Sequence, residues 1–519
     1  MRIDTVLRRA AHTYPHSVAT EFEDRSRTWS DLLHRVRRLA GALRGLGVGP
    51  GDRVAVLGHN SDRYLEVLYA VPWAGAIVVP VNTRLAAPET DHWLRDSGSR
   101  VLLVEQEFRD LAEKLRGGLP GLAHVVGIDV PDAPAGWHDY ETLLAGAAAL
   151  PAAEGPDTDP AAIFYTGGTT GRSKGVTLSH RNLLASALQS LVDLGWSESS
   201  VYLHAAPMFH MADGLGTYAA LLAAARQTMC RRFDVPRVLA AIEEHGVTCS
   251  VMVPTMIDML VSHPDTGRHD LSTVACLAFG GSPMPEATVR RARGVLPAAR
   301  LFQLYGQSEA SPTLTVLRPE YHVFDGPLAG KTRSAGRPAT GCEVAVVGED
   351  GAFLPPGEVG EIVGRGDNVM LGYWQRPELT AETLRGGWLH TGDAGYLDED
   401  GFLFVVDRIK DMIVTGGENV YSAEVENALM LHPEVTEAQV IGIPATEWGE
   451  AVHAIVRVRG PRVPTAEEII AHCRAHIANY KCPKSVEFRD EPFPTSGAGK
   501  YVKQQLREQY WAGRERRVN

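Results

Sequence analysis

The strongest constraint on the fold is an alternation of helical patterns with short apolar, strand-like runs over the first four hundred residues. These runs are RVAVLGHN (53–60), AIVVPVN (76–82), RVLLVEQ (100–106), AAIFYTGG (161–168), SVMVPT (250–255), VACLAFGG (274–281) and ARLFQLYGQ (299–307). Several of them end in Gly, Asn or Thr, and such alternation is typical of layered α/β structure with sites at the strand ends. We therefore expect an α/β fold.

The pattern changes near residue 340. Between about residues 340 and 406 short strands and turns dominate, which predicts a smaller β-rich subdomain. The tail from about residue 409 alternates helical and strand-like runs again and has enough apolar residues for its own core. Because 519 residues exceed what one hydrophobic core usually supports, we expect an N-terminal domain over 1–407 and a small α+β C-terminal domain over 408–519.

Charge and hydropathy exclude several function classes. A net charge of −12 argues against a nucleic-acid partner, since non-specific binding to the phosphate backbone depends on Lys and Arg. No apolar run approaches the roughly 20 residues that span a bilayer, and the N-terminus lacks a signal-peptide core. We expect a cytoplasmic protein with no membrane span. The six cysteines form no CxxC pair, so buried or incidental thiols are favoured over disulfides or a zinc site.

The segment FYTGGTTGRSKGV (164–176) follows a strand-like run and combines flexible glycines, threonine hydroxyls and a lysine. Glycine lets backbone N–H groups wrap around an anion, while hydroxyls and an ammonium complete the shell around phosphate oxygens. The segment does not match the Walker pattern, because Lys174 is followed by Gly175. The chain has only eight lysines, so a lysine in a Gly-rich turn is notable. We predict a phosphate loop; a Gly/Thr-rich hairpin turn is the alternative.

At this loop the chain resembles the adenylate-forming superfamily, which includes acyl-CoA synthetases, peptide-synthetase adenylation domains and luciferases. Further strings resembling that family occur in its order: PMFHMADG (207–214), FGGSPM (279–284), LYGQSEA (304–310), WLHTGDAGYLDEDGFL (388–403), DRIKDMIVTGGENVYSAEVE (407–426) and PTSGAGK (494–500). Together they span most of the chain. The resemblance implies an AMP-forming acid:CoA ligase. The acid attacks the α-phosphate of ATP and releases pyrophosphate, and the thiolate of coenzyme A then displaces AMP from the acyl-adenylate.

The resemblance also assigns roles in nucleotide binding. Glu309 matches the family's Mg²⁺ ligand, with Thr166 as its hydroxyl partner, and oxygen ligands suit magnesium. Asp393 is expected to accept both ribose hydroxyls, and Arg408 to support the ribose. Tyr305 resembles the ring stacked on adenine, although a buried aromatic is often only core packing. The full expected set is Thr166, Gly167, Gly168, Thr169, Thr170, Gly171, Lys174, Gly281, Ser282, Gln303, Tyr305, Gly306, Ser308, Asp393 and Arg408.

The resemblance implies that two lysines take part in the family's conformational changes. Lys500 matches the lysine that the family swings onto the carboxylate and α-phosphate during adenylation, a task suited to a point charge on a flexible stem. An exposed loop lysine is the alternative. The family rotates its small C-terminal domain between the two half-reactions, and Lys410 occupies the hinge position.

For coenzyme A, the glycines Gly416 and Gly417 are expected to let the pantetheine arm pass beside the backbone. Trp448 resembles an adenine-stacking tryptophan, and Tyr480 and Lys484 resemble its neighbours. Some relatives carry an arginine where Cys482 stands here, so the phosphate contact is expected to be looser or rerouted.

His210 stands where amino-acid-activating relatives place an aspartate for the substrate's ammonium. A neutral or gating histidine there disfavours a free amino acid, and His210 joins Lys500 and Glu309 as an expected catalytic residue. The expected acyl pocket is largely apolar and indicates a hydrophobic acid, aliphatic, alicyclic or aromatic, whose size adaptable methionines leave open. Its residues are His210, Met211, Gly214, Met252, Val253, Thr255 and Phe279, with Gly281 beside them.

Three functions stay open at this point. The first is the complete acid:CoA ligase. The second is an enzyme that performs one half-reaction, either passing an adenylate to a carrier protein or accepting a preformed adenylate. The third is an inactive nucleotide-binding protein, against which the intact set of motif residues argues. A homodimer is expected only from the family resemblance.

Overall fold

The computed structural model describes residues 1–166, 173–416, 418–459, 462–495 and 501–512. By the density of its internal contacts the chain divides into two units. The first comprises Met1–Thr166, Ser173–Val344 and Gly364–Leu389, and the second includes Ala345–Val363 and His390–Asn519. The expected boundary at 407/408 stays a prediction. No described helix combines the length and the apolar composition needed to cross a membrane.

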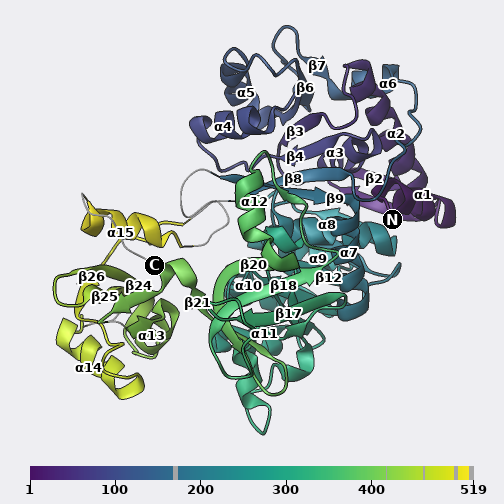
Figure 1. The fold of residues 1–519 in the computed structure, drawn as a ribbon. Helices are drawn as coiled ribbons and strands as arrows, with labels where there is room; N and C mark the ends of the chain where they lie inside the picture. Colours follow the sequence, from purple (N-terminus) through teal and green to yellow (C-terminus); the bar gives the residue numbers. More distant parts are fainter. Residues whose placement is uncertain (167–172, 417, 460–461, 496–500, 513–519) are drawn as a thin grey trace. The chain divides into compact units, whose positions relative to one another are not determined.

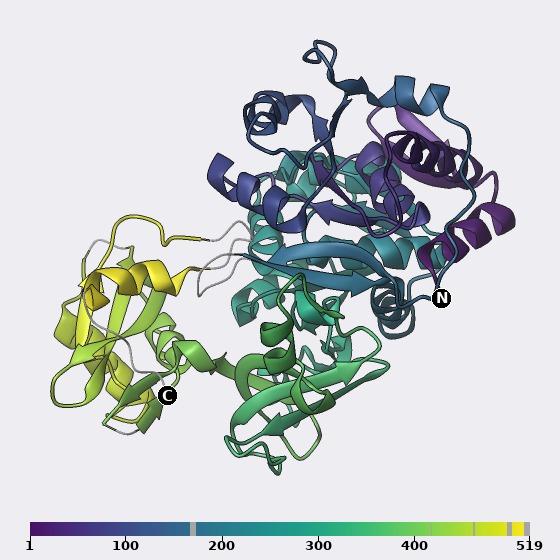
Figure 2. The same ribbon diagram turned by 45° about the horizontal axis from the view of Figure 1, so that its top comes forward.

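The first unit contains two large sheets, which Figures 1 and 2 show from two directions. One has the strand order β16 (Arg337–Pro338), β15 (Thr315–Leu317), β14 (Arg300–Tyr305), β13 (Cys276–Gly280), β12 (Cys249–Met252), β10 (Val201–His204), β11 (Arg226–Met229), β1 (Val18–Phe22), β2 (Arg25–Thr28). The other has the order β19 (Gly372–Tyr373), β9 (Lys174–Ser179), β8 (Pro160–Thr166), β4 (Ile77–Pro80), β3 (Arg53–Leu57), β5 (Val101–Glu105), β6 (His124–Ile128), β7 (His138–Asp139). All seven runs expected to be strands lie on strands of these sheets.

Apolar side chains on both faces of each sheet explain why helices cover them. The central core joins inward-facing residues of the two sheets to α1 (Ile3–Thr13), α2 (Trp29–Gly45), α3 (Asp62–Trp73), α7 (His180–Gln189) and α8 (Met211–Ala223). The outer face of the β3 sheet packs on α4 (Ala87–Ser97) and α5 (Arg109–Arg116). The outer face of the β12 sheet packs on α9 (Val235–His245), α10 (Pro254–Ser262) and α11 (Glu286–Val295). The first unit is therefore a layered α/β structure, as the alternation predicts.

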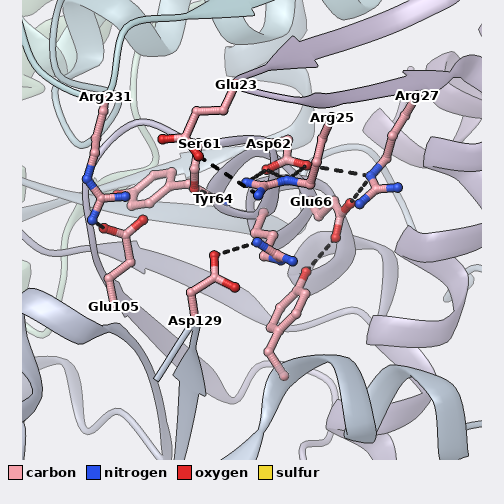
Figure 3. A network of polar contacts seen from close by, with 12 residues as sticks. Glu23, Arg25, Arg27, Ser61, Asp62, Tyr64, Glu66, Glu105, Asp129 and Arg231 are labelled. Carbon is pink, nitrogen blue, oxygen red and sulfur yellow. Dashed lines mark hydrogen bonds and ion pairs between the residues drawn. The ribbon is translucent and has the colours of Figure 1, made fainter. Parts of the chain in front are cut away.

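Helix α3 is buried along its whole length and includes charged residues. Figure 3 shows part of their compensation: the Asp62 carboxylate accepts hydrogen bonds from Arg25 at 2.8 to 3.2 Å. Glu66 accepts a hydrogen bond from the Tyr140 hydroxyl at 2.6 Å. Glu66 also forms an ion pair with Arg35. Buried charges are tolerated only when they are paired and hydrogen-bonded. The network therefore ties α3 to β2, α2 and α6 (Tyr140–Gly146).

The turn-rich region from residue 340 forms a four-stranded sheet in the order β17 (Cys342–Val347), β18 (Gly360–Gly366), β20 (Leu389–Leu397), β21 (Leu403–Arg408), with α12 (Pro377–Thr383) in the same stretch of chain. The tail forms a sheet of β23 (Glu418–Val420), β22 (Ile413–Thr415), β25 (Gly449–Val458) and β24 (Val435–Ala445), and β26 (Ser485–Phe488) pairs with β25. Helices α13 (Ser422–Met430), α14 (Ala466–His476) and α15 (Lys503–Trp511) accompany this sheet (Figure 1). The fold class expected from the sequence is thus confirmed.

Candidate active site

The candidate phosphate loop leaves the end of β8 and returns on β9, where Thr166 pairs with Lys174. Tyr165, the residue before it, is anchored: its hydroxyl donates to Asp96 at 2.8 Å and its ring stacks on Trp93 at 4.7 Å. Gly167, Gly168, Thr169, Thr170 and Gly171 lie outside the described residues. The strands that carry the two ends of the loop are therefore fixed by hydrogen bonds and ring stacking.

Tyr305 is the last residue of β14, and Glu309 follows four residues later. A Cβ atom at Gly306 would lie 2.1 Å from the carbonyl oxygen of Pro312, so no larger residue fits there without a shift. Glu309 is 7% exposed, and its carboxylate accepts a hydrogen bond from the Tyr373 hydroxyl at 2.8 Å. Burial, helped by the neighbouring carboxylate, raises the pKa of Tyr373, which keeps that hydroxyl protonated as a donor.

The ring of the same tyrosine contacts Lys174. The Lys174 ammonium lies 5.2 Å from the Tyr373 ring centroid, within the range of a cation–π contact. Tyr373 on β19 thus bridges the candidate phosphate lysine and the candidate magnesium ligand. The sequence analysis did not single out this residue, because only the pairing of β19 with β9 brings it to the loop.

The expected adenine-binding residues lie at the ends of neighbouring strands. Gly280 on β13 pairs with Leu304 on β14, and Phe279 pairs with Gln303. Gly281 and Ser282 are exposed just after β13. Gln303, Tyr305, Gly306 and Ser308 are half-buried around the end of β14. Parallel strands that end side by side gather such residues at one edge of the sheet, where ligands of α/β folds bind.

His210 precedes α8, whose position is set by a buried polar network. His204 on β10 and Asp213 on α8 are both fully buried and lie 2.6 Å apart through Nδ1 and Oδ2. The Tyr202 hydroxyl donates to the other carboxylate oxygen at 3.0 Å, and Gln227 lies 3.2 Å from His204 Nε2. Asp213 is three residues beyond His210, so this network fixes the start of the helix at the half-buried His210. The sequence analysis missed these buried residues as well.

The other expected acyl-pocket residues fall on two faces of one sheet. Met211 lies in the central core, and a Cβ atom at Gly214 would meet its methyl at 3.0 Å. Met252 and Phe279 pair across β12 and β13 and pack instead in the outer core with Val253. Thr255 is exposed on α10. Met211 belongs to α8, which packs on the inner face of the sheet, whereas Met252 and Phe279 point from their strands to the outer face.

In the second unit, Asp393 on β20 pairs with Arg408 on β21, and Arg408 Nε lies 3.2 Å from the carboxylate. Asp393 is 7% exposed, whereas the Arg408 side chain is 42% exposed. Two residues on, burial and the charge of Arg408 lower the pKa of the candidate hinge Lys410 to about 8. Lys500 lies outside the described residues.

The expected coenzyme A residues also lie in the second unit. The Gly416 amide donates to the Trp448 carbonyl at 2.9 Å, and Gly416 adopts a positive φ of 60°. Lys484 Nζ lies 5.3 Å from the Trp448 ring centroid, and Trp448 and Tyr480 are each 42% exposed. Cys482 is buried in the core of the small sheet and offers no surface group. Gly417 lies outside the described residues.

The chain matches known protein families over most of its length. The family described as AMP-binding enzyme matches residues 7–374. The chain belongs to the AMP-binding enzyme family. The AMP-binding enzyme C-terminal domain matches residues 424–500. Membership confirms the resemblance to adenylate-forming enzymes and the enzyme class: the protein is an ATP-dependent, AMP-forming ligase of the acyl-CoA synthetase type.

Similar proteins cover nearly the whole chain. A feruloyl-CoA synthase of Amycolatopsis sp. is 41% identical over 97% of this chain and 98% of its own length. A fatty acid–[acyl-carrier-protein] ligase, ScoC of Streptomyces coeruleorubidus, is 38% identical over 97% of this chain and 96% of its own length. Among solved structures, o-succinylbenzoate CoA synthetase from Bacillus subtilis, in complex with its acyl-adenylate intermediate, has a TM-score of 0.84 at 32% identity, covering 96% of this chain and 97% of that one.

Proposed function

We propose that the enzyme activates an aromatic or otherwise hydrophobic carboxylic acid with ATP and transfers the acyl group to coenzyme A. The contact of Tyr373 with both Glu309 and Lys174 supports the nucleotide half of this proposal most directly. Lys174 begins β9 and Glu309 lies just after β14. A cation and a carboxylate placed together suit the neutralisation of phosphates and the binding of their metal ion during adenylation.

We assign the binding of Mg²⁺ to Glu309 and Thr166. The donor set suits that ion, since Mg²⁺ usually takes one or two protein oxygen ligands and fills its remaining positions with water and phosphate oxygens. When bound, the ion would neutralise charge on the phosphates. Tyr373 orients the Glu309 carboxylate by its hydrogen bond, and Lys174 supplies a point charge at the loop.

The remaining residue assignments follow the sequence analysis. Asp393 and Arg408 are assigned to the ribose, Tyr305 and Gly281 to the adenine, and Lys500 to the carboxylate and α-phosphate. The mobile C-terminal domain begins at residue 408 in this proposal, and Lys410 is its pivot. The homodimer and the cytoplasmic location stay predictions.

The choice of an aromatic or hydrophobic acid rests on the apolar surroundings of His210 and on the relatives. Met211 is buried beside Gly214, and one relative is a feruloyl-CoA synthase. A half-buried histidine in place of a buried carboxylate offers no anionic counter-ion to an ammonium group. We therefore place free amino acids outside the substrate range.

The acceptor has a second candidate. One relative is a fatty acid–[acyl-carrier-protein] ligase, so the second half-reaction of this chain is transfer either to coenzyme A or to a carrier protein. The exposed Trp448 with Lys484 over its ring favours coenzyme A, since an indole face and an ammonium suit an adenine and a phosphate.

The experiment that tests the proposal incubates the protein with ATP, Mg²⁺ and a panel of hydrophobic and aromatic acids, with and without coenzyme A. Pyrophosphate and acyl-CoA are followed separately. We expect both products with at least one aromatic acid. Pyrophosphate without thioester would reject coenzyme A as the acceptor and favour the carrier protein. Neither product with any acid would favour an inactive nucleotide-binding protein.

A Lys500→Ala variant should lose pyrophosphate release but still convert a synthetic acyl-adenylate to thioester.

A further inference from the structure

The last described helix of the second unit, α15, is attached to its sheet by an apolar face. Leu506 is 4% exposed and packs with Ile441, Ile455 and Phe493. The Trp511 indole donates to the Gly442 carbonyl at 2.9 Å. Figure 2 shows this helix, in yellow, against the small sheet. These contacts account for the docking of α15 without any charged group.

The same helix presents a second face with two cations one turn apart, Lys503 and Arg507. Like charges at this spacing repel each other, and both side chains are largely buried, at 13% and 12% exposure. Burial alone would lower the pKa of Lys503, but the carboxylates of Glu426 and Asp407 outweigh it and raise that pKa. Lys503 is therefore held in its charged form by these carboxylates.

Two of the carboxylates near these cations, Asp407 and Asp411, lie in the segment that contains Lys410. Arg507 forms an ion pair with Asp411. Lys503 Nζ lies 2.7 Å from Glu426 and donates to the Ser422 hydroxyl, which donates in turn to Asp407 at 2.6 Å. Asp407 also accepts the Arg408 amide at 2.7 Å. The charged face of α15 thus binds Asp411 directly and Asp407 through the Ser422 hydroxyl, one carboxylate on each side of the candidate hinge.

The chain just before α15 carries Lys500. The flanks of residues 496–500 are joined to each other: Thr495 and Tyr501 form an antiparallel bridge, and the Val502 amide donates to the Pro494 carbonyl at 2.9 Å. Lys503 follows the second flank directly. The ion pairs and hydrogen bonds of Lys503 and Arg507 therefore also determine where these two flanks lie relative to residues 407–411.

We propose that Lys503 and Arg507 are positioning residues for adenylation, which lock the flanks of the Lys500 segment to the hinge segment 407–411. The role rests on the proposed two-step function and on the part assigned to Lys500. A buried ion pair is a poor way to gain stability, because desolvation offsets most of the attraction, but it fixes one geometry well. Reaction rates depend strongly on such geometry, since a misplacement of about 1 Å can cost about a hundredfold in rate.

The experiment compares the wild-type protein with Lys503→Met and Arg507→Met, which keep side-chain length and remove the charge. We expect pyrophosphate release to fall about tenfold or more in each variant. Thioester formation from a synthetic acyl-adenylate should stay within about twofold of wild type, because that step does not use Lys500. Arg507→Lys should recover part of the pyrophosphate release, since it restores a cation opposite Asp411.

A double-mutant cycle and a matched control separate this role from a merely structural one. Asp411→Asn combined with Arg507→Met should cost no more than either change alone, because the pair acts as a unit. Arg462→Ala removes an exposed ion pair with Glu468 on α14 and should change neither half-reaction. Equal losses in both half-reactions of the Arg507→Met and Lys503→Met variants, or no loss in either, would overturn the proposal.

A readout that needs no catalysis completes the test. Amide hydrogen exchange of the peptide covering residues 501–505 should be faster in Arg507→Met than in wild type and unchanged in Arg462→Ala. If the wild-type protein releases no pyrophosphate with any acid, the proposed function fails, whereas unchanged exchange in Arg507→Met rejects the lock itself. The two failures are therefore distinguishable.

Discussion

The hydroxyl of Tyr373 donates a hydrogen bond to the Glu309 carboxylate at 2.8 Å, while the ring of Tyr373 lies 5.2 Å from the Lys174 ammonium. One side chain thereby contacts an anion and a cation that come from segments far apart in the sequence. A residue of this kind orients groups that bind a metal and phosphates, and loss of such a supporting contact typically costs about 10- to 100-fold in metal affinity or activity.

Tyr373→Phe should raise the Mg²⁺ concentration needed for half-maximal pyrophosphate release about tenfold, because Glu309 loses the donor that orients it. The packing of the ring is kept, so stability should change little. Thioester formation from a synthetic acyl-adenylate should be unchanged. Binding of Mn²⁺ in the presence of ATP should weaken by a similar factor, and Tyr321→Phe serves as the control. An unaltered Mg²⁺ dependence would show that Tyr373 only packs.

Trp448→Ala should raise the KM for coenzyme A about tenfold, since loss of an aromatic stacking surface typically costs about 1 to 3 kcal/mol. Pyrophosphate release measured without coenzyme A should not change. Steady-state kinetics with coenzyme A as the varied substrate measures the effect, and Val463→Ala, at another exposed apolar position, is the control. If the KM for coenzyme A stays the same, the nucleotide of coenzyme A binds elsewhere.

The free energy of unfolding should decrease as the pH is lowered below about 6.5, and His322 is one cause. Burial lowers the pKa of His322 to about 4, so between these values the unfolded chain binds a proton that the folded protein does not. His180, whose pKa burial lowers to about 3, acts in the same direction. Stability is therefore full above pH 6.5 and is lost as the pH falls, by about 1.4 kcal/mol per pH unit for each such histidine.

Urea unfolding at pH 7, 6 and 5 measures this slope. His322→Leu removes the titrating group, and we expect its free energy of unfolding to fall less steeply with acid, by about 1.4 kcal/mol per pH unit relative to wild type. The exposed His16→Leu should leave the slope as it is. Parallel slopes for wild type and His322→Leu would contradict the assignment.

Arg35→Met should destabilise the first unit by about 3 to 5 kcal/mol, because it leaves the fully buried Glu66 without its main cationic partner. Among the described residues, Glu66 then keeps the Tyr140 hydroxyl and Arg27, whose Nε lies 3.5 Å from its carboxylate; Figure 3 shows Arg27 beside Glu66. Arg365→Ala, which removes an exposed pair with Glu343, should cost at most about 1 kcal/mol. Chemical denaturation of both variants provides the comparison, and similar costs would show that burial adds nothing at Glu66.

Much of the architecture could be predicted because the evidence for it is local. Strand-like runs such as 53–60 and 299–307 carry their apolar pattern within a few residues, and they form β3 and β14. The order of short strings identifies the family in the same way. Local patterns do not predict how the residues of the expected acyl pocket are distributed. Met211 and Met252 lie in cores on opposite faces of one sheet, and a local pattern does not specify which face a residue joins.

The amino-acid sequence is sufficient to establish the layered α/β fold, the family and the segments that carry its chemistry, since each follows from periodicity or from a contiguous string. The contacts of Tyr373 with Glu309, of His204 with Asp213, and of Arg507 with Asp411 emerge only in three dimensions. The physical reason is that strand register and helix packing bring these partners together across 64, 9 and 96 positions of the chain. No local sequence pattern encodes those separations, although these three contacts position the residues of the candidate site.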